Sequence, residues 1–232
     1  MAEGAVVTAG GVRLVYSDSG LRERPVAVLL HALGERRSSW DVVTPLLLER
    51  FRVVAFDLRG HGESDWPGSY SFRAMCEDVL DALEQLRLTN VTLVGHSMGA
   101  VVAYLATLRK PGTVRRLVVE DAPPPYERDR PVPVRDEEAH GFDWAVVPAI
   151  VSEVNAGDPE TWAALSSIEA PTLMIAGGPM SHIAQDRLAD VASRIPECKL
   201  VTIPAGHHVH SAEPAAFVRT LFDWLDAGVV TV

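Results

Sequence analysis

The sequence predicts an α/β fold with a mostly parallel, doubly wound sheet. Several short runs are apolar throughout, which is typical of strands in a parallel sheet covered on both faces. Stretches with apolar residues at helical spacing alternate with these runs, and that order builds a sheet through right-handed crossovers. The chain has 232 residues, of which 47% are hydrophobic, so it can bury one large core as a single domain.

The expected elements follow in chain order. An early antiparallel pair is expected within 7–17, and apolar strands are expected at 26–30, 52–56, 91–94, 117–119, 172–176 and 200–203. Helices are expected at 39–49, 72–86, 98–108, 186–195 and 214–225. The last of these has an apolar face formed by Phe217, Leu221, Trp224 and Leu225.

One segment, residues 122–170, contains no apolar strand. Its first part is rich in proline, which disfavours regular structure. Aromatic and aliphatic residues then recur at roughly helical spacing, namely Phe142, Trp144, Val147, Ile150 and Val151, followed by Trp162 and Leu165. We predict a short helical lid at 122–170, inserted into a core of residues 1–121 and 171–232. The alternative is a second small packing layer without a functional role.

Composition excludes several classes of partner. The net charge is −10 and no block is rich in Lys or Arg, which argues against nucleic acid or anionic membrane as a partner. No apolar run approaches the roughly 20 residues that a membrane helix needs. Residues 1–4 show no basic region followed by an apolar core, so no signal peptide is expected. We expect a cytoplasmic protein that acts on a small molecule. The sequence leaves its oligomeric state open.

The motif Gly95-His96-Ser97-Met98-Gly99 carries the strongest chemical signal. It follows the strand at 91–94 and opens the helix at 98–108. A serine at a sharp strand-to-helix turn has its hydroxyl exposed above the sheet, where it can attack a carbonyl. Ser97 is therefore the candidate nucleophile, and it needs a base within hydrogen-bond reach because a free hydroxyl is weak.

Three further sequence blocks occur together with this motif in the order expected for one family. Through these four blocks the chain resembles the α/β-hydrolase superfamily over essentially its whole length. The three further blocks are His31-Ala32-Leu33-Gly34, Asp57-Leu58-Arg59-Gly60-His61-Gly62-Glu63-Ser64 and Ala205-Gly206-His207. The resemblance implies a sheet of the α/β-hydrolase type, His207 as the base and an oxyanion hole formed by the backbone N–H groups of Leu33 and Met98. It also implies a structural role for His31 and for the block 57–64. Ala32 departs from the family, which usually has glycine there.

The third member of the triad is expected to be Asp121. The family usually carries its acid in the loop after the strand 172–176, but that loop has no carboxylate until Asp186. A subgroup carries the acid after the preceding strand, where this chain has Glu120 and Asp121. The order Ser97, Asp121, His207 keeps the succession of the fold. Glu120 is the rival, and Asp121 could instead cap the turn into the prolines.

The expected function is that of a serine hydrolase, which cleaves an ester, thioester or lactone of a small apolar substrate through an acyl-serine intermediate. Phe142, Trp144 and Trp162 are the candidate substrate-binding residues. We expect no cofactor and no metal, and we interpret His208 and His210 as loop and packing residues. Two alternatives remain open: a lyase or cyclisation catalyst that uses the same cavity, and a ligand receptor that retains the triad.

Overall fold

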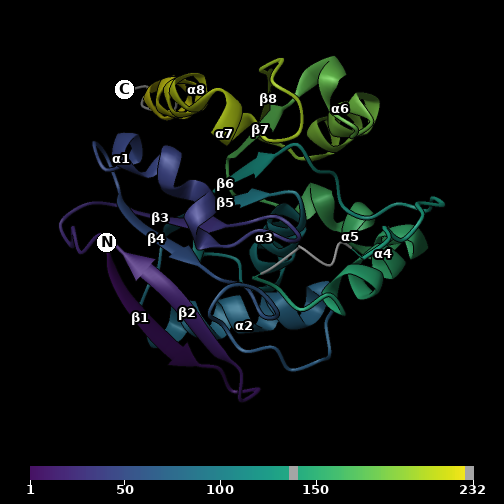
Figure 1. The fold of residues 1–232 in the computed structure, drawn as a ribbon. Helices are drawn as coiled ribbons and strands as arrows, with labels where there is room; N and C mark the ends of the chain where they lie inside the picture. The colour runs from purple at the N-terminus through teal and green to yellow at the C-terminus, as the bar shows by residue number, and fades with distance from the viewer. Residues whose placement is uncertain (136–140, 228–232) are drawn as a thin grey trace.

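The structure, a computed structural model, describes residues 1–135 and 141–227. Within this part of the chain, eight strands form one sheet in the order β1-β2-β4-β3-β5-β6-β7-β8 (Figure 1). The strands are β1 Ala2–Val7, β2 Arg13–Asp18, β3 Val26–Leu30, β4 Arg52–Phe56, β5 Val91–His96, β6 Val114–Glu120, β7 Thr172–Ala176 and β8 Cys198–Thr202. β1 and β2 pair antiparallel, and the strands from β3 to β8 pair parallel. The predicted fold class is confirmed.

The α-helices are α1 Thr44–Leu47, α2 Phe72–Gln85, α3 Met98–Arg109, α4 Val146–Ala156, α5 Pro159–Ala164, α6 Gln185–Arg194, α7 Val209–Ala212 and α8 Pro214–Ala227. Three 3₁₀ turns complete the list, η1 Arg37–Val42, η2 Leu165–Ser167 and η3 Gly178–Met180. The prediction of one helix at 39–49 is wrong, because η1 and the single turn α1 occupy that region. Pro45 stands in the first turn of α1 and lacks the N–H that a continuous helix would need there.

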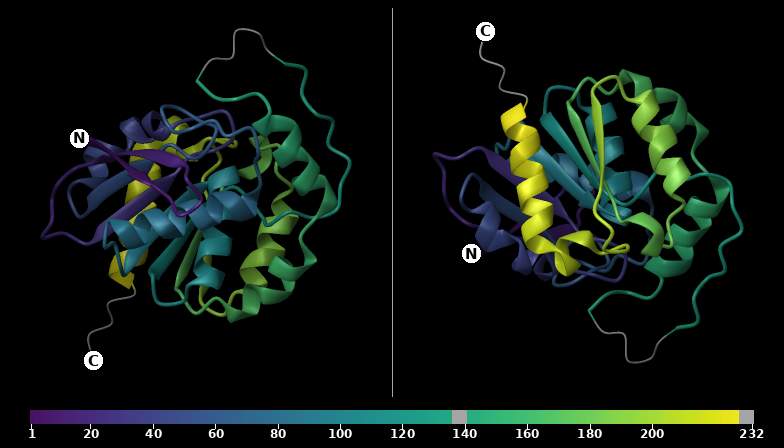
Figure 2. Two further views of the ribbon diagram at one scale, coloured as in Figure 1. Left: turned by 90° about the horizontal axis from the view of Figure 1, so that it is seen from below. Right: turned by 90° about the horizontal axis from the view of Figure 1, so that it is seen from above.

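Two clusters of buried apolar side chains lie on the two faces of the sheet. Figure 2 shows the helices that cover these faces. Successive side chains of a strand point to opposite faces, so Val28 and Leu30 of β3 join one cluster while Ala27 and Leu29 join the other. The first cluster is completed by α2, α3 and α6, and the second by η1, α1 and α8. Apolar side chains therefore cover both faces of the sheet.

The segment between β6 and β7 contains α4, α5 and η2. Its residues 136–140 lie outside the described residues. α5 packs against α3, and η2 against α6, so this segment lies beside the core helices (Figure 1). The stretch from Phe142 to Trp144 is not helical, because Phe142 forms an isolated bridge with His61 and the helix begins only at Val146. Within 1–135 and 141–227, no helix has the length and apolar character to cross a membrane.

Candidate active site

Ser97 lies at the turn between β5 and α3 with a φ of 52° and a ψ of −112°. A positive φ is uncommon for a residue other than glycine and persists only where the surrounding structure enforces it. Gly95 and Gly99 enforce it here, because a Cβ on Gly95 would overlap the backbone of α3 and a Cβ on Gly99 would overlap the Leu30 carbonyl group. Close packing of β3, β5 and α3 therefore requires both glycines and holds Ser97 at the carboxyl edge of the sheet.

The structure brings His207 and Asp121 together at this edge. His207 lies in the loop between β8 and α7, and Asp121 directly follows β6. His207 Nδ1 is 2.8 Å from Asp121 Oδ2, and the aspartate side chain is fully buried. A carboxylate can only accept, so Nδ1 carries the proton and Nε2 is the nitrogen that can accept one. Ser97 and His207 line the same cavity.

The Asp121 carboxylate is held by the loop that follows β7. The Gly177 N–H donates to Oδ1 over 2.8 Å, the Ser181 hydroxyl donates to Oδ2, and Gln185 Nε2 lies 3.4 Å from Oδ1. Burial alone would raise the pKa of Asp121, but the hydrogen bonds from His207, Ser181 and Gly177 outweigh it and hold the pKa below its ordinary value. The sequence alone indicates no role for Ser181 or Gln185. The one available signal was the position of Ser181 in the loop that usually carries the acid.

Glu120 faces a different partner from its neighbour. Its carboxylate accepts from the backbone N–H of His210 over 2.8 Å, and Oε2 lies 2.8 Å from His210 Nδ1. The His210 ring stacks on Trp40 with centroids 4.2 Å apart. The structure thus directs the two adjacent acids to two different histidines, and Asp121 is the one beside His207.

The buried side chain of His96 contacts the backbone of the His207 loop and connects it to Glu35. His96 Nε2 donates to the His207 carbonyl oxygen over 2.8 Å, and His96 Nδ1 is 3.6 Å from the Glu35 carboxylate. Glu35 also lies 3.3 Å from His208 Nε2. Burial by itself lowers the pKa of His96, but the nearby carboxylates of Glu120 and Glu35 outweigh it and raise the pKa. This group fixes the backbone of the loop that carries His207.

Three side chains near His207 have the types and spacing that could hold a metal ion. The ligand atoms of Glu35, His96 and His210 lie within 4.8 Å of one another, and His96 Nδ1 and His210 Nε2 are buried without a hydrogen-bond partner among the described residues. The sequence alone does not reveal this group, because its members lie on a loop, a strand and a short helix that are far apart in the chain. They converge only in the tertiary structure.

The loop after β3 forms another part of the cavity wall through Ala32 and Leu33. Leu33 and Met98 line the cavity together with Ser97. Gly34 makes the turn with a φ of 80°, and Ala32 is not among the described residues with positive φ. Alanine in place of the family's glycine therefore requires no left-handed backbone here.

Two buried histidines brace this loop as structural groups. His31 Nε2 accepts from the Leu58 N–H over 3.0 Å, and burial lowers the pKa of His31 to about 4, so the ring is neutral. His61 Nε2 accepts from the Gly34 N–H over 3.1 Å, and burial lowers the pKa of His61 to about 3. Because both rings use Nε2 to accept backbone N–H groups, they position the loop rather than transfer protons.

The cavity has a volume of about 250 Å³. Its apolar wall includes Val101 of α3 and Ile150, Val151 and Val154 of α4. Arginine, histidine and proline side chains also line it, together with Phe72, Ala122 and Ile183.

None of the three aromatic residues predicted to bind substrate lines this cavity. Phe142 stacks on His61 with centroids 5.8 Å apart, and Trp144 lies 6.0 Å from Phe142. Trp162 donates its indole N–H to the Pro125 carbonyl oxygen over 2.8 Å. All three aromatic residues are half-buried, and aliphatic residues of α4 line the cavity instead.

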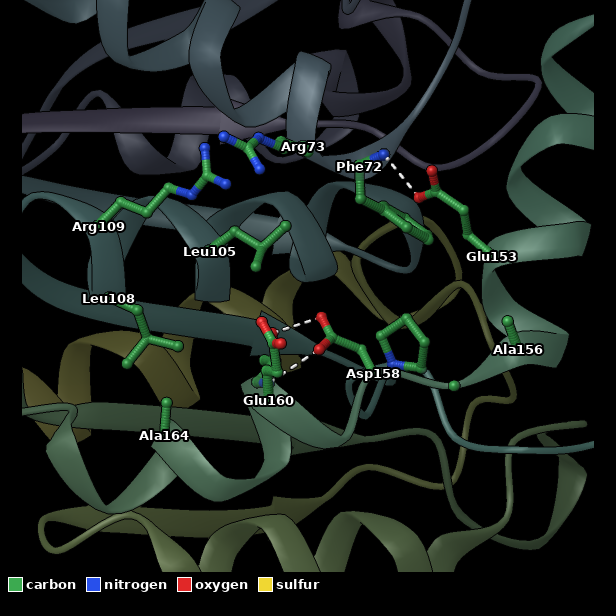
Figure 3. A pocket seen from close by; sticks show the side chains of 13 residues that line it. Phe72, Arg73, Leu105, Leu108, Arg109, Glu153, Ala156, Asp158, Glu160 and Ala164 are labelled. Carbon is green, nitrogen blue, oxygen red and sulfur yellow. Dashed lines mark hydrogen bonds between the residues drawn. The ribbon is translucent and has the colours of Figure 1, made fainter.

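A larger cavity of about 430 Å³ shares Phe72 and Pro125 with the lining of the Ser97 cavity (Figure 3). Its wall includes Arg73 and Arg109 as well as Glu153, which accepts from the Phe72 N–H over 2.9 Å. Neither Ser97 nor His207 lines it. Because the candidate nucleophile and base both open into the smaller cavity, the smaller one is the candidate active site.

Comparisons with known proteins place the chain among α/β hydrolases. Several relatives align with this chain over most of the length of both proteins. One is a putative esterase/lipase of Haemophilus influenzae, which is 26% identical in an alignment that covers 87% of this chain and 83% of the relative. A mouse sn-1-specific diacylglycerol lipase is 27% identical, with 87% and 81% covered. A putative 2-succinyl-6-hydroxy-2,4-cyclohexadiene-1-carboxylate synthase of Bacillus subtilis is 25% identical, with 95% and 97% covered.

Among solved structures, a hydrolase from Pseudomonas aeruginosa PA01 superposes with a TM-score of 0.85 at 26% identity, covering 96% of this chain and 98% of that one. Residues 25–142 match the model of the alpha/beta hydrolase fold family. That match spans half of the chain and includes the Ser97 motif, the block 57–64 and Asp121. The chain belongs to the α/β hydrolase fold family.

Proposed function

We propose that the protein is a serine hydrolase that cleaves a carboxylic ester, thioester or lactone through an acyl-Ser97 intermediate. The observation that carries the proposal is the His207–Asp121 pair at 2.8 Å, which opens into the same cavity as the serine of the strand–turn–helix motif. The names of the Haemophilus influenzae and mouse relatives, an esterase/lipase and a lipase, support ester cleavage.

The proposed reaction has two steps. Ser97 Oγ attacks the carbonyl carbon while His207 Nε2 takes its proton, and His207 then protonates the leaving alcohol or thiol. A water molecule, deprotonated by the same nitrogen, cleaves the acyl-enzyme and releases the acid. Asp121 keeps the proton on Nδ1 and stabilises the imidazolium. The N–H groups of Leu33 and Met98 would stabilise the oxyanion, with added positive potential from the N-terminus of α3. The scheme uses no cofactor.

The experiment that tests the proposal combines labelling with turnover. The purified chain is treated with a fluorophosphonate and analysed by intact mass, and aryl esters, thioesters and lactones of graded acyl length are tested as substrates. A single covalent adduct together with many turnovers per chain supports the hydrolase. Absence of both would overturn it and favour the lyase or cyclisation reading, the class suggested by the name of the Bacillus subtilis relative. An adduct without turnover would favour a receptor.

The aliphatic face of α4 is expected to set acyl-chain preference. Val154 lines the cavity, so Val154→Trp should fill part of the space and lower kcat/KM for octanoate esters by about tenfold or more, with a smaller effect on acetate. A long acyl chain would have to enter a space that the indole already fills, and such overpacking costs free energy. The measurement is kcat/KM for 4-nitrophenyl acetate, butyrate and octanoate.

Trp144→Ala serves as the contrast to Val154→Trp, because Trp144 does not line the cavity. It should affect the three esters equally. If Trp144→Ala instead discriminated between acyl chains and Val154→Trp did not, the aromatic residues rather than α4 would contact substrate.

A further inference from the structure

The ionisable side chains that line the Ser97 cavity are all arginines or histidines, namely Arg128, Arg130, His182, His207 and His208. No aspartate or glutamate of the described residues lines it. Burial lowers the pKa of His182 to about 4, so the positive charge of the lining comes from the two arginines. The chain as a whole has 31 acidic residues against 21 lysines and arginines, so the charge of this lining is opposite in sign to the net charge of the molecule. A low-dielectric cavity lined with one sign of charge attracts ligands of the other sign.

Arg128 is held in place while part of its guanidinium group is left without a partner. Its guanidinium carbon lies 4.8 Å from the centroid of the Tyr126 ring, and Nη1 is 3.3 Å from the Tyr126 hydroxyl oxygen. Its Nε is buried and has no hydrogen-bond partner within residues 1–135 and 141–227. A buried charged donor without an acceptor is costly, and an anion in the cavity would supply the acceptor.

Arg130 is anchored through its backbone and adds a second charge. Its N–H donates to Asn155 Oδ1 over 2.9 Å and its carbonyl oxygen accepts from Asn155 Nδ2 over 2.8 Å. Burial, and then the nearby charge of Arg128, lower the pKa of Arg130. Elsewhere arginines such as Arg52 and Arg59 contact carboxylates, whereas these two form no ion pair with the described residues.

We propose that the substrate carries a carboxylate, which Arg128 and Arg130 bind while Ser97 attacks the acyl carbonyl carbon. This inference rests on the proposed function, since it assigns a substrate class to the same cavity. A guanidinium fork matches a carboxylate through two parallel N–H···O bonds, which fixes the orientation of the substrate as well as its charge. The aliphatic residues of α4 then contact the carbon chain between the carboxylate and the reacting carbonyl.

The test compares substrates that differ only in charge. One pair is the mono-4-nitrophenyl ester of succinic acid and its methyl-capped diester, with the charge on the acyl side. The other is the butyrate ester of 4-hydroxybenzoic acid and its methyl ester, with the charge on the leaving group. Wild type should prefer the charged member of one pair, and Arg128→Gln/Arg130→Gln should lose about tenfold or more of that preference. The preference should also shrink at high salt.

Arg115→Gln/Arg219→Gln is the matched control, because it removes the same charge from exposed positions on β6 and α8. It should keep the preference. Equal activity of wild type on both members of both pairs, or an equal loss on charged and neutral esters in the cavity variant, would overturn the carboxylate assignment.

A binding measurement separates this proposal from the proposed function. Glutarate, but not its dimethyl ester, should raise the melting temperature of Ser97→Ala, and the shift should vanish when Arg128→Gln/Arg130→Gln is added. An arginine-dependent shift in a chain that hydrolyses no ester would retain the anion site and reject the hydrolase. Hydrolysis of neutral esters without any such shift would retain the hydrolase and reject the anion site.

Discussion

Ser97→Ala is expected to abolish fluorophosphonate labelling and to lower ester turnover by about 10⁴-fold or more. The members of a triad act as a unit, so loss of the nucleophile leaves only what the oxyanion hole and binding contribute. The left-handed backbone at residue 97 is enforced by the packing of Gly95 and Gly99 and does not depend on the hydroxyl. The fold should therefore be retained, which circular dichroism and thermal melting can verify.

Ser193→Ala is the matched control for this prediction. Ser193 is exposed on α6, and its hydroxyl donates only to the Asp190 carbonyl oxygen. This variant should label and turn over as wild type does. Undiminished labelling of Ser97→Ala, with the adduct mapped to another serine, would exclude Ser97 as the nucleophile.

Asp121→Asn is expected to lower kcat by about 10³-fold to 10⁴-fold while the chain stays folded. The amide of asparagine can donate to His207 Nδ1, which would move the proton to Nε2 and leave that nitrogen unable to accept the serine proton. The asparagine carbonyl can still accept from the Gly177 N–H, so the loop after β7 keeps one of its contacts. The measurement is kcat with a saturating aryl ester, together with thermal melting.

Two neighbouring carboxylates serve as controls for Asp121→Asn. Asp186→Asn is exposed at the start of α6 and should leave kcat unchanged. Glu120→Gln disturbs the buried contact with His210, so it should cost thermal stability more than kcat. The assignment of Asp121 as the triad acid would be contradicted by either of two results. One is a kcat for Asp121→Asn within a factor of about two of wild type, and the other is an equal loss of kcat in Asp186→Asn.

The parts of the fold and of the site that depend on residues close together in the sequence were predictable from the sequence. Apolar runs and helical spacing predicted the parallel sheet, because burial on both faces imposes that pattern on each strand separately. The turn at Ser97 was predictable for the same reason: a strand, two glycines and a helix within one short segment define its local geometry. Where a local rule was overlooked, as with Pro45, the helix prediction was wrong.

Only the tertiary structure decided how distant segments meet. The sequence left Glu120 and Asp121 as rivals, and the loops that approach from β7 and β8 pair Asp121 with His207 and Glu120 with His210. Spacing alone could not show that the aromatic residues of the insertion lie outside the cavity lining, or that the Trp162 indole N–H donates to the Pro125 carbonyl oxygen. Arg128 shares the Ser97 cavity through the path of a loop that has no periodic pattern. The periodic pattern of buried residues can be recognised within each segment by itself. Hydrogen-bond partners and cavity linings instead depend on which distant segments the packed sheet brings together.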